Sequence, residues 1–188
     1  MDEAQVEALL ERVGALAAVH HEAGGAHRLR RFERFDPLGD PVAAEQLGRA
    51  LAERLAPGAH DLVAVWDGID TSVLGYVVGR ALERSVVRIY DHEGLITASA
   101  PIPAGARAVF VAPAILDPQQ PRLARALMET RDATLASVAA LVDVGDPGER
   151  PIALVRLDSF SPDECPACRR GEPLANARVS LAPGGRNG

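Results

Sequence analysis

The sequence contains no lysine, and all 20 of its basic residues are arginines. Any mechanism that requires a lysine amine is therefore excluded, although the abundance of Ala, Gly, Pro and Arg also points to genomic base composition. Acidic residues number 26, which leaves a net charge of −6. Binding to the nucleic-acid backbone needs a basic face, so a sequence-independent nucleic-acid binder is not expected.

Long apolar runs are also missing, and none approaches the length needed to span a membrane. The first residues, MDEAQVEALLERV, are acidic and amphipathic, unlike a signal peptide. We therefore expect a cytoplasmic protein without a membrane partner. With 188 residues, 47% of them hydrophobic, the chain is long enough for one domain with a proper core. We expect that domain over residues 1–174, followed by a flexible tail over 175–188.

What the sequence does contain is an alternation of strand and helix patterns joined by short connections. Such an alternation predicts an α/β fold, with a mostly parallel five-stranded sheet and flanking helices. Residues 92–106 are expected to form a loop or a short hairpin. Gly75 and Gly79 would let the helix over 73–83 lie close to the sheet. Helices are expected over 2–18, 40–58, 73–83 and 121–132, and strands over 61–66, 85–91, 106–113, 133–145 and 151–160.

The stretch Ala108–Pro121, AVFVAPAILDPQQP, is the natural place to look for a ligand. It is an apolar strand that ends in a loop leading into a helix, and parallel α/β domains bind ligands at such junctions. Trp66 and Asp143 stand at the ends of other expected strands. Trp66 is expected in the core or in the space of a ligand, and Asp143 either contacts a base or ribose or caps a turn.

Several motifs resemble the type I phosphoribosyltransferases, and within them the orotate phosphoribosyltransferase group. They include VHHEAGGAH (19–27), GDPVAAEQLGRALAE (39–53), ALVDVG (140–145) and DECPACRRGEPL (163–174), of which the last is the most specific. The resemblance extends from about Val6 to Leu174. It implies a fold with a hood, a dimer, nucleotide metabolism with pyrimidine biosynthesis in particular, and transfer chemistry that uses phosphoribosyl pyrophosphate (PRPP) with Mg²⁺.

The residues that such transfer requires differ in this sequence. The two carboxylates of the family's PRPP loop fall on Ala112 and Pro113, and its phosphate cradle falls on residues 116–120, LDPQQ. Asp117 would repel a phosphate by about 1 to 4 kcal/mol. The covering loop, DHEGLITASAPIP, lacks the family's lysine, and the pyrophosphate loop, WDGIDTS, carries Asp67 and Asp70.

We therefore expect a protein that has lost PRPP-dependent transfer and acts as a regulatory, ligand-binding or partner subunit. Its partners would be a second copy of itself or an active paralogue, together with a nucleotide or nucleobase ligand. No cofactor is expected, and Mg²⁺ only if PRPP chemistry is retained. The candidate ligand-binding residues are Asp67, Gly68, Asp70, Thr71, Ser72, His92, Asp117, Gln119, Gln120 and Asp143.

Two alternatives remain open for the same residues. One is an active phosphoribosyltransferase with a divergent site. The other is a metal-assisted enzyme on an altered substrate, using Asp67, Asp70 or Asp117 with His92. Ser72, His92 and Asp70 also supply the residue types of a hydrolytic triad, but no nucleophile-elbow pattern accompanies them.

Cys165 and Cys168 form a single CxxC, which is half of a zinc site. We favour a structural turn over a metal shared between subunits, because no second pair of cysteines accompanies it. His20, His21 and His27 flank a Gly-Gly turn, and a hairpin is favoured there over metal binding.

Overall fold

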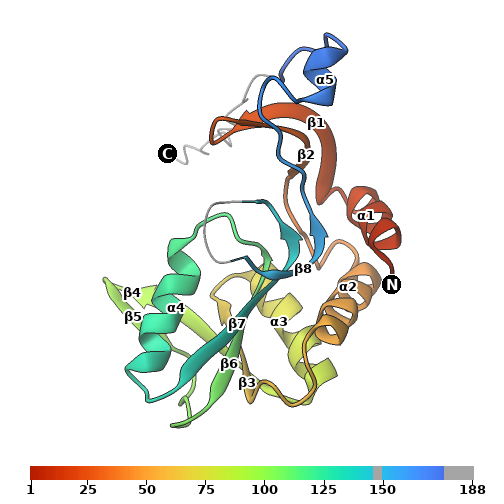
Figure 1. Ribbon diagram of the computed structural model, residues 1–188. Helices are drawn as coiled ribbons and strands as arrows, with labels where there is room; N and C mark the ends of the chain where they lie inside the picture. Colours follow the sequence, from red (N-terminus) through yellow and green to blue (C-terminus); the bar gives the residue numbers. More distant parts are fainter. Residues whose placement is uncertain (146–149, 176–188) are drawn as a thin grey trace, which may run out of the picture.

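The computed structural model describes residues 1–145 and 150–175 (Figure 1). They contain five helices and eight strands, and the strands form a two-stranded hairpin and a six-stranded sheet. The tail over 176–188 lies outside the described residues. The elements are α1 Glu3–Arg12, β1 Leu16–Ala23, β2 Ala26–Phe32, α2 Pro41–Arg54, β3 Leu62–Trp66, α3 Ile69–Leu82, β4 Ser85–His92, β5 Leu95–Ala98, β6 Arg107–Ala114, α4 Gln119–Glu129, β7 Thr134–Asp143, β8 Ile152–Arg156 and α5 Pro166–Arg169.

The main sheet has the strand order β5-β4-β3-β6-β7-β8. The five strands predicted from the sequence are all present and run parallel to one another. A sixth strand, β5, pairs antiparallel with β4 inside the segment predicted as a loop or short hairpin. Residues Leu95–Ala98 of this segment therefore extend the edge of the sheet.

Helices cover both faces of this sheet, as the near-continuous apolar strands predict. Alternate residues of β3 point to opposite sides, so that Val63 and Val65 pack in one core cluster and Leu62 in the other. The first cluster contains the buried faces of α1, α2 and α3, and the second contains that of α4. The α3 and α4 helices thus lie on opposite faces of the sheet.

Gly75 and Gly79 hold α3 close to the sheet, which confirms that prediction. A Cβ atom at Gly75 would lie 2.5 Å from Val65 Cγ1, and one at Gly79 would lie 2.5 Å from Val86 Cγ2. The helix begins at Ile69 and not at the predicted residue 73, so part of the loop WDGIDTS is helical. The N-terminus of α3 therefore lies directly at the carboxyl end of β3.

The predicted first helix is too long, because residues 2–18 divide into α1 and the start of β1. Gly14 has φ +72°, a conformation that favours glycine and ends the helix. The β1–β2 hairpin then rises above the body together with the C-terminal segment that carries α5 (Figure 1). We call β1, β2 and residues 157–175 the hood.

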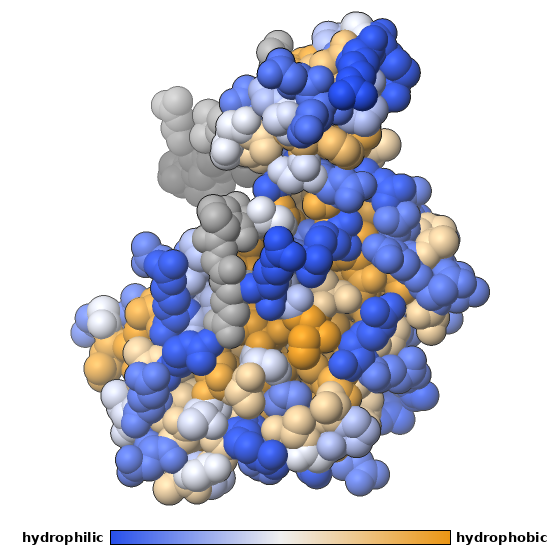
Figure 2. All heavy atoms as spheres, viewed as in Figure 1, coloured by the Kyte–Doolittle hydropathy of each residue, from blue (hydrophilic) through white to orange (hydrophobic). Residues whose placement is uncertain are grey.

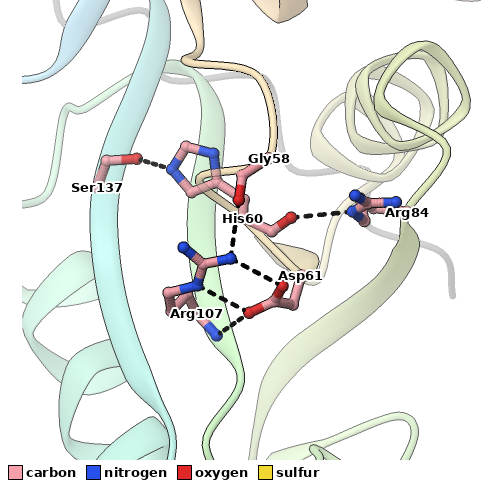
Figure 3. A network of polar contacts seen from close by, with 6 residues as sticks. All are labelled: Gly58, His60, Asp61, Arg84, Arg107 and Ser137. Atoms are coloured by element: carbon pink, nitrogen blue, oxygen red, sulfur yellow. Dashed lines mark hydrogen bonds and ion pairs between the residues drawn. The ribbon is translucent and has the colours of Figure 1, made fainter.

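Polar contacts close the amino-terminal edge of the sheet (Figure 3). The Arg107 side chain, at the start of β6, donates to Asp61 Oδ2 at 3.0 Å and to Asp61 Oδ1 at 3.1 Å. These hydrogen bonds lower the pKa of Asp61 to about 2. His60 Nε2 lies 2.7 Å from Ser137 Oγ, and burial lowers the pKa of His60.

Among the described residues, no helix is both long and apolar enough to cross a membrane.

Candidate functional site

The carboxyl ends of β3 and β6 form the point where the chain changes direction across the sheet. From β3 the sheet grows through β4 on one side and through β6 on the other, and the following helices cover opposite faces. Ligands of open α/β sheets bind in the crevice at such a switch point. The pairing of β3 with β6 ends at Ala64 and Phe110, whereas β6 continues beside β7 to Ala114. The two strands therefore separate at this edge.

A cleft of about 210 Å³ lies between these strand ends. Three segments line it: the turn after β3, the end of β6 with the loop that follows, and Phe32 at the end of the hood hairpin. Its lining residues are Phe32, Trp66, Asp67, Gly68, Asp70, Thr71, Ala112, Pro113, Ala114, Leu116, Asp117 and Gln120. In Figure 2, apolar surface gathers on the body below the hood, with polar side chains beside it.

The turn after β3 is held by the Thr71 hydroxyl, which donates to the Trp66 carbonyl at 2.5 Å and to the Gly68 carbonyl at 3.1 Å. A Cβ atom at Gly68 would lie 3.0 Å from Asp70 Oδ1 and 3.1 Å from Thr71 Oγ1, so a larger residue would crowd this turn. Asp70 lies in the first turn of α3, where the helix dipole stabilises a carboxylate.

The loop after β6 is closed by Asp117. Its Oδ1 accepts the backbone N–H of Gln119 at 2.9 Å, at the first residue of α4. A free helix N-terminus binds anions through such N–H groups. Here one of those groups is bonded to a carboxylate of the chain itself.

The cleft is acidic. Asp67, Asp70 and Asp117 line it, and no Arg or His does so among the described residues. Arg88 lies outside the lining and donates to Asp67 Oδ1 at 2.8 Å, which balances one of the three charges. The cleft therefore favours neutral or cationic ligands over anions.

The Mg²⁺ ion implied by the resemblance does not fit these residues. Ala112 and Pro113 occupy the positions of the family's paired carboxylates, and neither side chain has an oxygen. The three aspartates do not form a group of converging ligands; among the residues described, only His20, His27, Cys165 and Cys168 do so.

The cleft thus unites six of the ten candidate ligand residues: Asp67, Gly68, Asp70, Thr71, Asp117 and Gln120. Ser72 and Gln119 lie on the adjoining helices but do not line it, and His92 ends β4 at the hairpin with β5. The proposed grouping of Ser72, Asp70 and His92 therefore does not meet in the cleft.

Asp143 has the turn role that the sequence left open. Its Oδ1 accepts the Gly145 N–H at 2.9 Å, and its Oδ2 accepts Arg156 Nε at 2.9 Å. Both carboxylate oxygens are therefore engaged within the chain.

Sequence reasoning missed Phe32 as a lining residue and left Trp66 undecided. Trp66 lines the cleft at the end of β3. Phe32 reaches it from the hood, and only the expectation of a hood over the sheet could have suggested this. Cys165 and Cys168 do not line the cleft but lie in the hood, where they meet His20 and His27.

Comparison with known proteins agrees with the resemblance. No family model matches the sequence. Orotate phosphoribosyltransferases from two strains of Thermus thermophilus are 29% identical over 177 residues, covering 88% of this chain and 96% of the relative.

Solved structures resemble most of the fold at lower sequence identity. Orotate phosphoribosyltransferase from Aeropyrum pernix matches with a TM-score of 0.61 and 15% identity, covering 80% of this chain and 93% of that one. Adenine phosphoribosyltransferase from Thermoanaerobacter pseudethanolicus matches with a TM-score of 0.59 and 16% identity, covering 78% and 99%. The chain therefore has the type I phosphoribosyltransferase fold, and its sequence is similar to orotate phosphoribosyltransferases over most of its length.

Proposed function

We propose that this phosphoribosyltransferase-like chain does not transfer phosphoribosyl groups from PRPP. Its cleft instead binds a small, uncharged ligand of the nucleobase or nucleoside class. The protein would then serve nucleotide metabolism as a regulatory or partner subunit, in a homodimer or with an active paralogue.

Asp117 is the observation that carries this proposal. Its carboxylate bonds the first N–H of α4, at the place where the resemblance puts the 5′-phosphate of PRPP. A phosphate charge within about 4 Å of this carboxylate would be repelled by about 1 kcal/mol in water and about 4 kcal/mol at a protein surface. Asp67 and Asp70 add negative charge on the opposite wall of the cleft.

The covering segment supports the same conclusion. Its residues form the β4–β5 hairpin, in which Tyr90 pairs with Thr97 and His92 with Leu95. A leaving pyrophosphate would need a cation here, and residues 91–103 contain neither lysine nor arginine.

The size and lining of the cleft indicate what would bind in place of PRPP. Its volume of about 210 Å³ lies below the roughly 300 to 1,000 Å³ of typical ligand pockets, so the ligand would be small. Phe32 and Trp66 contribute aromatic surface that can pack against a flat ring. Gln120 and the three aspartates offer hydrogen-bonding groups to ring N–H and sugar hydroxyls.

Isothermal titration with PRPP and Mg²⁺ tests the loss of transfer. We expect no binding at concentrations up to the millimolar range, and no PRPP-dependent consumption of orotate, while an active orotate phosphoribosyltransferase gives both signals in parallel. Micromolar PRPP binding would overturn the proposal and support the alternative hypothesis of an active phosphoribosyltransferase with a divergent site.

A thermal-shift screen of nucleobases and nucleosides tests whether the cleft binds an uncharged ligand of this class. A ligand present at about 100 times its Kd stabilises the fold by about 2.7 kcal/mol, which such a screen detects. Trp66→Ala should abolish the shift, and Tyr76→Ala, at an exposed position of α3, should preserve it. A shift that survives Trp66→Ala would place the ligand elsewhere.

A further inference from the structure

We propose that His20, His27, Cys165 and Cys168 bind one zinc ion that joins the hood hairpin to the C-terminal segment. One ligand atom from each of these four side chains lies within 4.8 Å of the other three. The two histidines come from β1 and β2, and the two cysteines flank the start of α5. This inference does not depend on the function proposed for the cleft.

The spacing of the ligand atoms agrees with tetrahedral coordination. Zinc lies about 2.3 Å from sulfur and about 2.0 to 2.1 Å from nitrogen, which places ligand atoms roughly 3.3 to 3.8 Å apart. His20 Nε2 lies 3.4 Å from Cys165 Sγ and 3.6 Å from Cys168 Sγ, and His27 Nδ1 lies 3.1 Å from Cys168 Sγ. Two of these three distances fall in that range and the third lies just below it, and the four ligand atoms all lie within 4.8 Å of one another.

The surroundings of His20 prepare it for metal binding. Its other ring nitrogen, Nδ1, lies 3.0 Å from the Glu172 carbonyl oxygen. A proton on Nδ1 would donate to that carbonyl and leave the Nε2 lone pair directed at the two sulfurs. Histidines that ligate metals in proteins are usually oriented in this way.

Two of the other three ligands are buried, whereas Cys168 is exposed. Cys165 is fully buried. His27 is only 7% exposed. A buried thiol and imidazole facing one another without a metal would leave much of their bonding capacity unused.

Zinc is the ion that this ligand set favours. Two thiolates and two imidazoles form one of the common structural zinc sites, in which four protein ligands leave no position open for water or substrate. Oxygen-preferring ions such as Mg²⁺ and Ca²⁺ are disfavoured by sulfur ligands. Both cysteines are free, so the sulfurs are available as ligands.

The hood needs such a link because it has little core of its own. Most residues of β1 and β2 are only partly buried, and α5 has four residues. Backbone hydrogen bonds between His27 and Phe160, and from Ala175 to His20, join its two segments. Small units of this kind are commonly held together by a metal or a disulfide. Because Phe32 extends from this hairpin into the cleft, the zinc would also position one wall of the candidate site.

Metal analysis of the purified full-length chain tests the inference. We expect about one zinc per chain, and a Co²⁺-substituted protein with the intense visible bands of tetrahedral cobalt and a sulfur-to-cobalt charge-transfer band. His20→Asn and Cys165→Ser should each reduce bound zinc at least tenfold. His21→Asn is the matched control, since His21 bonds the Val19 carbonyl and lies outside the cluster.

Measurements on the unaltered chain keep the test decisive where a variant does not fold. Modification of both cysteines with an organomercurial should release the zinc in proportion to the thiols consumed. Substoichiometric zinc, a cobalt spectrum without charge transfer, or a Cys165–Cys168 disulfide in the purified chain would each overturn the proposal. About half a zinc per chain, bound by cysteines alone, would also overturn the proposal and would show a metal shared between subunits.

Discussion

Replacing Gly79 by alanine should destabilise the protein, although alanine is the better helix former. The added Cβ atom would lie 2.5 Å from Val86 Cγ2 and 2.9 Å from the Arg84 carbonyl oxygen. Nonbonded carbon atoms prefer about 3.5 to 4.0 Å, so one partner has to move by about 1 Å. The Arg84 backbone is restrained, because its N–H donates to the Gly79 carbonyl at 2.8 Å.

The size of the effect follows from two opposing contributions. Overpacking a filled site costs about 1 to 3 kcal/mol. Exchanging glycine for alanine inside a helix returns about 1 kcal/mol. Since one of the two close contacts is to backbone, we place the cost in the upper range and expect a net loss of about 1 to 2 kcal/mol in the free energy of unfolding. The Tm should fall by about 2 to 8 °C.

Urea denaturation of four chains measures this: the unaltered protein, Gly79→Ala, Val86→Ala and the double variant. Removing Val86 Cγ2 relieves one of the two contacts, so Gly79→Ala should cost at least about 0.5 kcal/mol less in the Val86→Ala background. Tyr76→Ala, on the exposed side of the same helix, should change stability by no more than about 0.5 kcal/mol. A Gly79→Ala variant as stable as the parent would refute the close packing of α3.

Two further predictions concern the ion pairs of the sheet edges. Because the pKa of Asp61 is lowered from 3.8 to about 2, its contribution to stability is present above pH 3.8 and is lost as the pH falls through 2. The Tm difference between the parent and Asp61→Asn should therefore be constant above about pH 5 and shrink towards pH 2; a difference independent of pH would contradict this. Asp143→Ala removes the acceptor of the Gly145 N–H and of Arg156, and should cost about 1.5 to 3 kcal/mol in urea denaturation. Asp143→Asn should cost less, and a loss below about 0.5 kcal/mol for the alanine would show the contacts to be unimportant.

The body of the fold could be predicted from the sequence because its signals are local. The central strands β3, β6 and β7 are apolar runs that are largely buried on both faces. The α2 helix begins where Asp40 caps it, because Asp40 Oδ1 accepts the Ala43 N–H at 2.9 Å. The first helix was predicted too long because Leu16 and Ala17 continue the apolar spacing of α1. The helix ends at the left-handed conformation of Gly14, which the spacing of apolar residues does not indicate.

The part of the candidate site that lies at strand ends could be predicted from the sequence. The part that the hood contributes could not. Residues directly after β3 and β6 meet because parallel strands place their carboxyl ends on one edge. His92 is the last residue of β4, also a strand of that sheet, yet it pairs with Leu95 of the antiparallel β5 in a hairpin at the edge and does not line the cleft. Recognising this required β5, which the sequence marks only weakly.

The four metal-binding candidates show the same limit most clearly. His20 and Cys165 are 145 residues apart in the sequence. The two histidines flank Gly24 and Gly25, and the two cysteines flank Pro166 and Ala167. Each of these patterns alone is typical of an ordinary turn. When each pair is considered alone, a turn is favoured over metal binding, because neither pair has enough ligands for a structural zinc site. Their combination depends on the return of the C-terminal segment to the hairpin, where Phe160 pairs with His27. If the hood is built around zinc while the cleft has lost its anion-binding groups, the structure of the hood does not depend on the chemistry of the cleft. The zinc site would then stabilise the hood whether or not the cleft transfers phosphoribosyl groups.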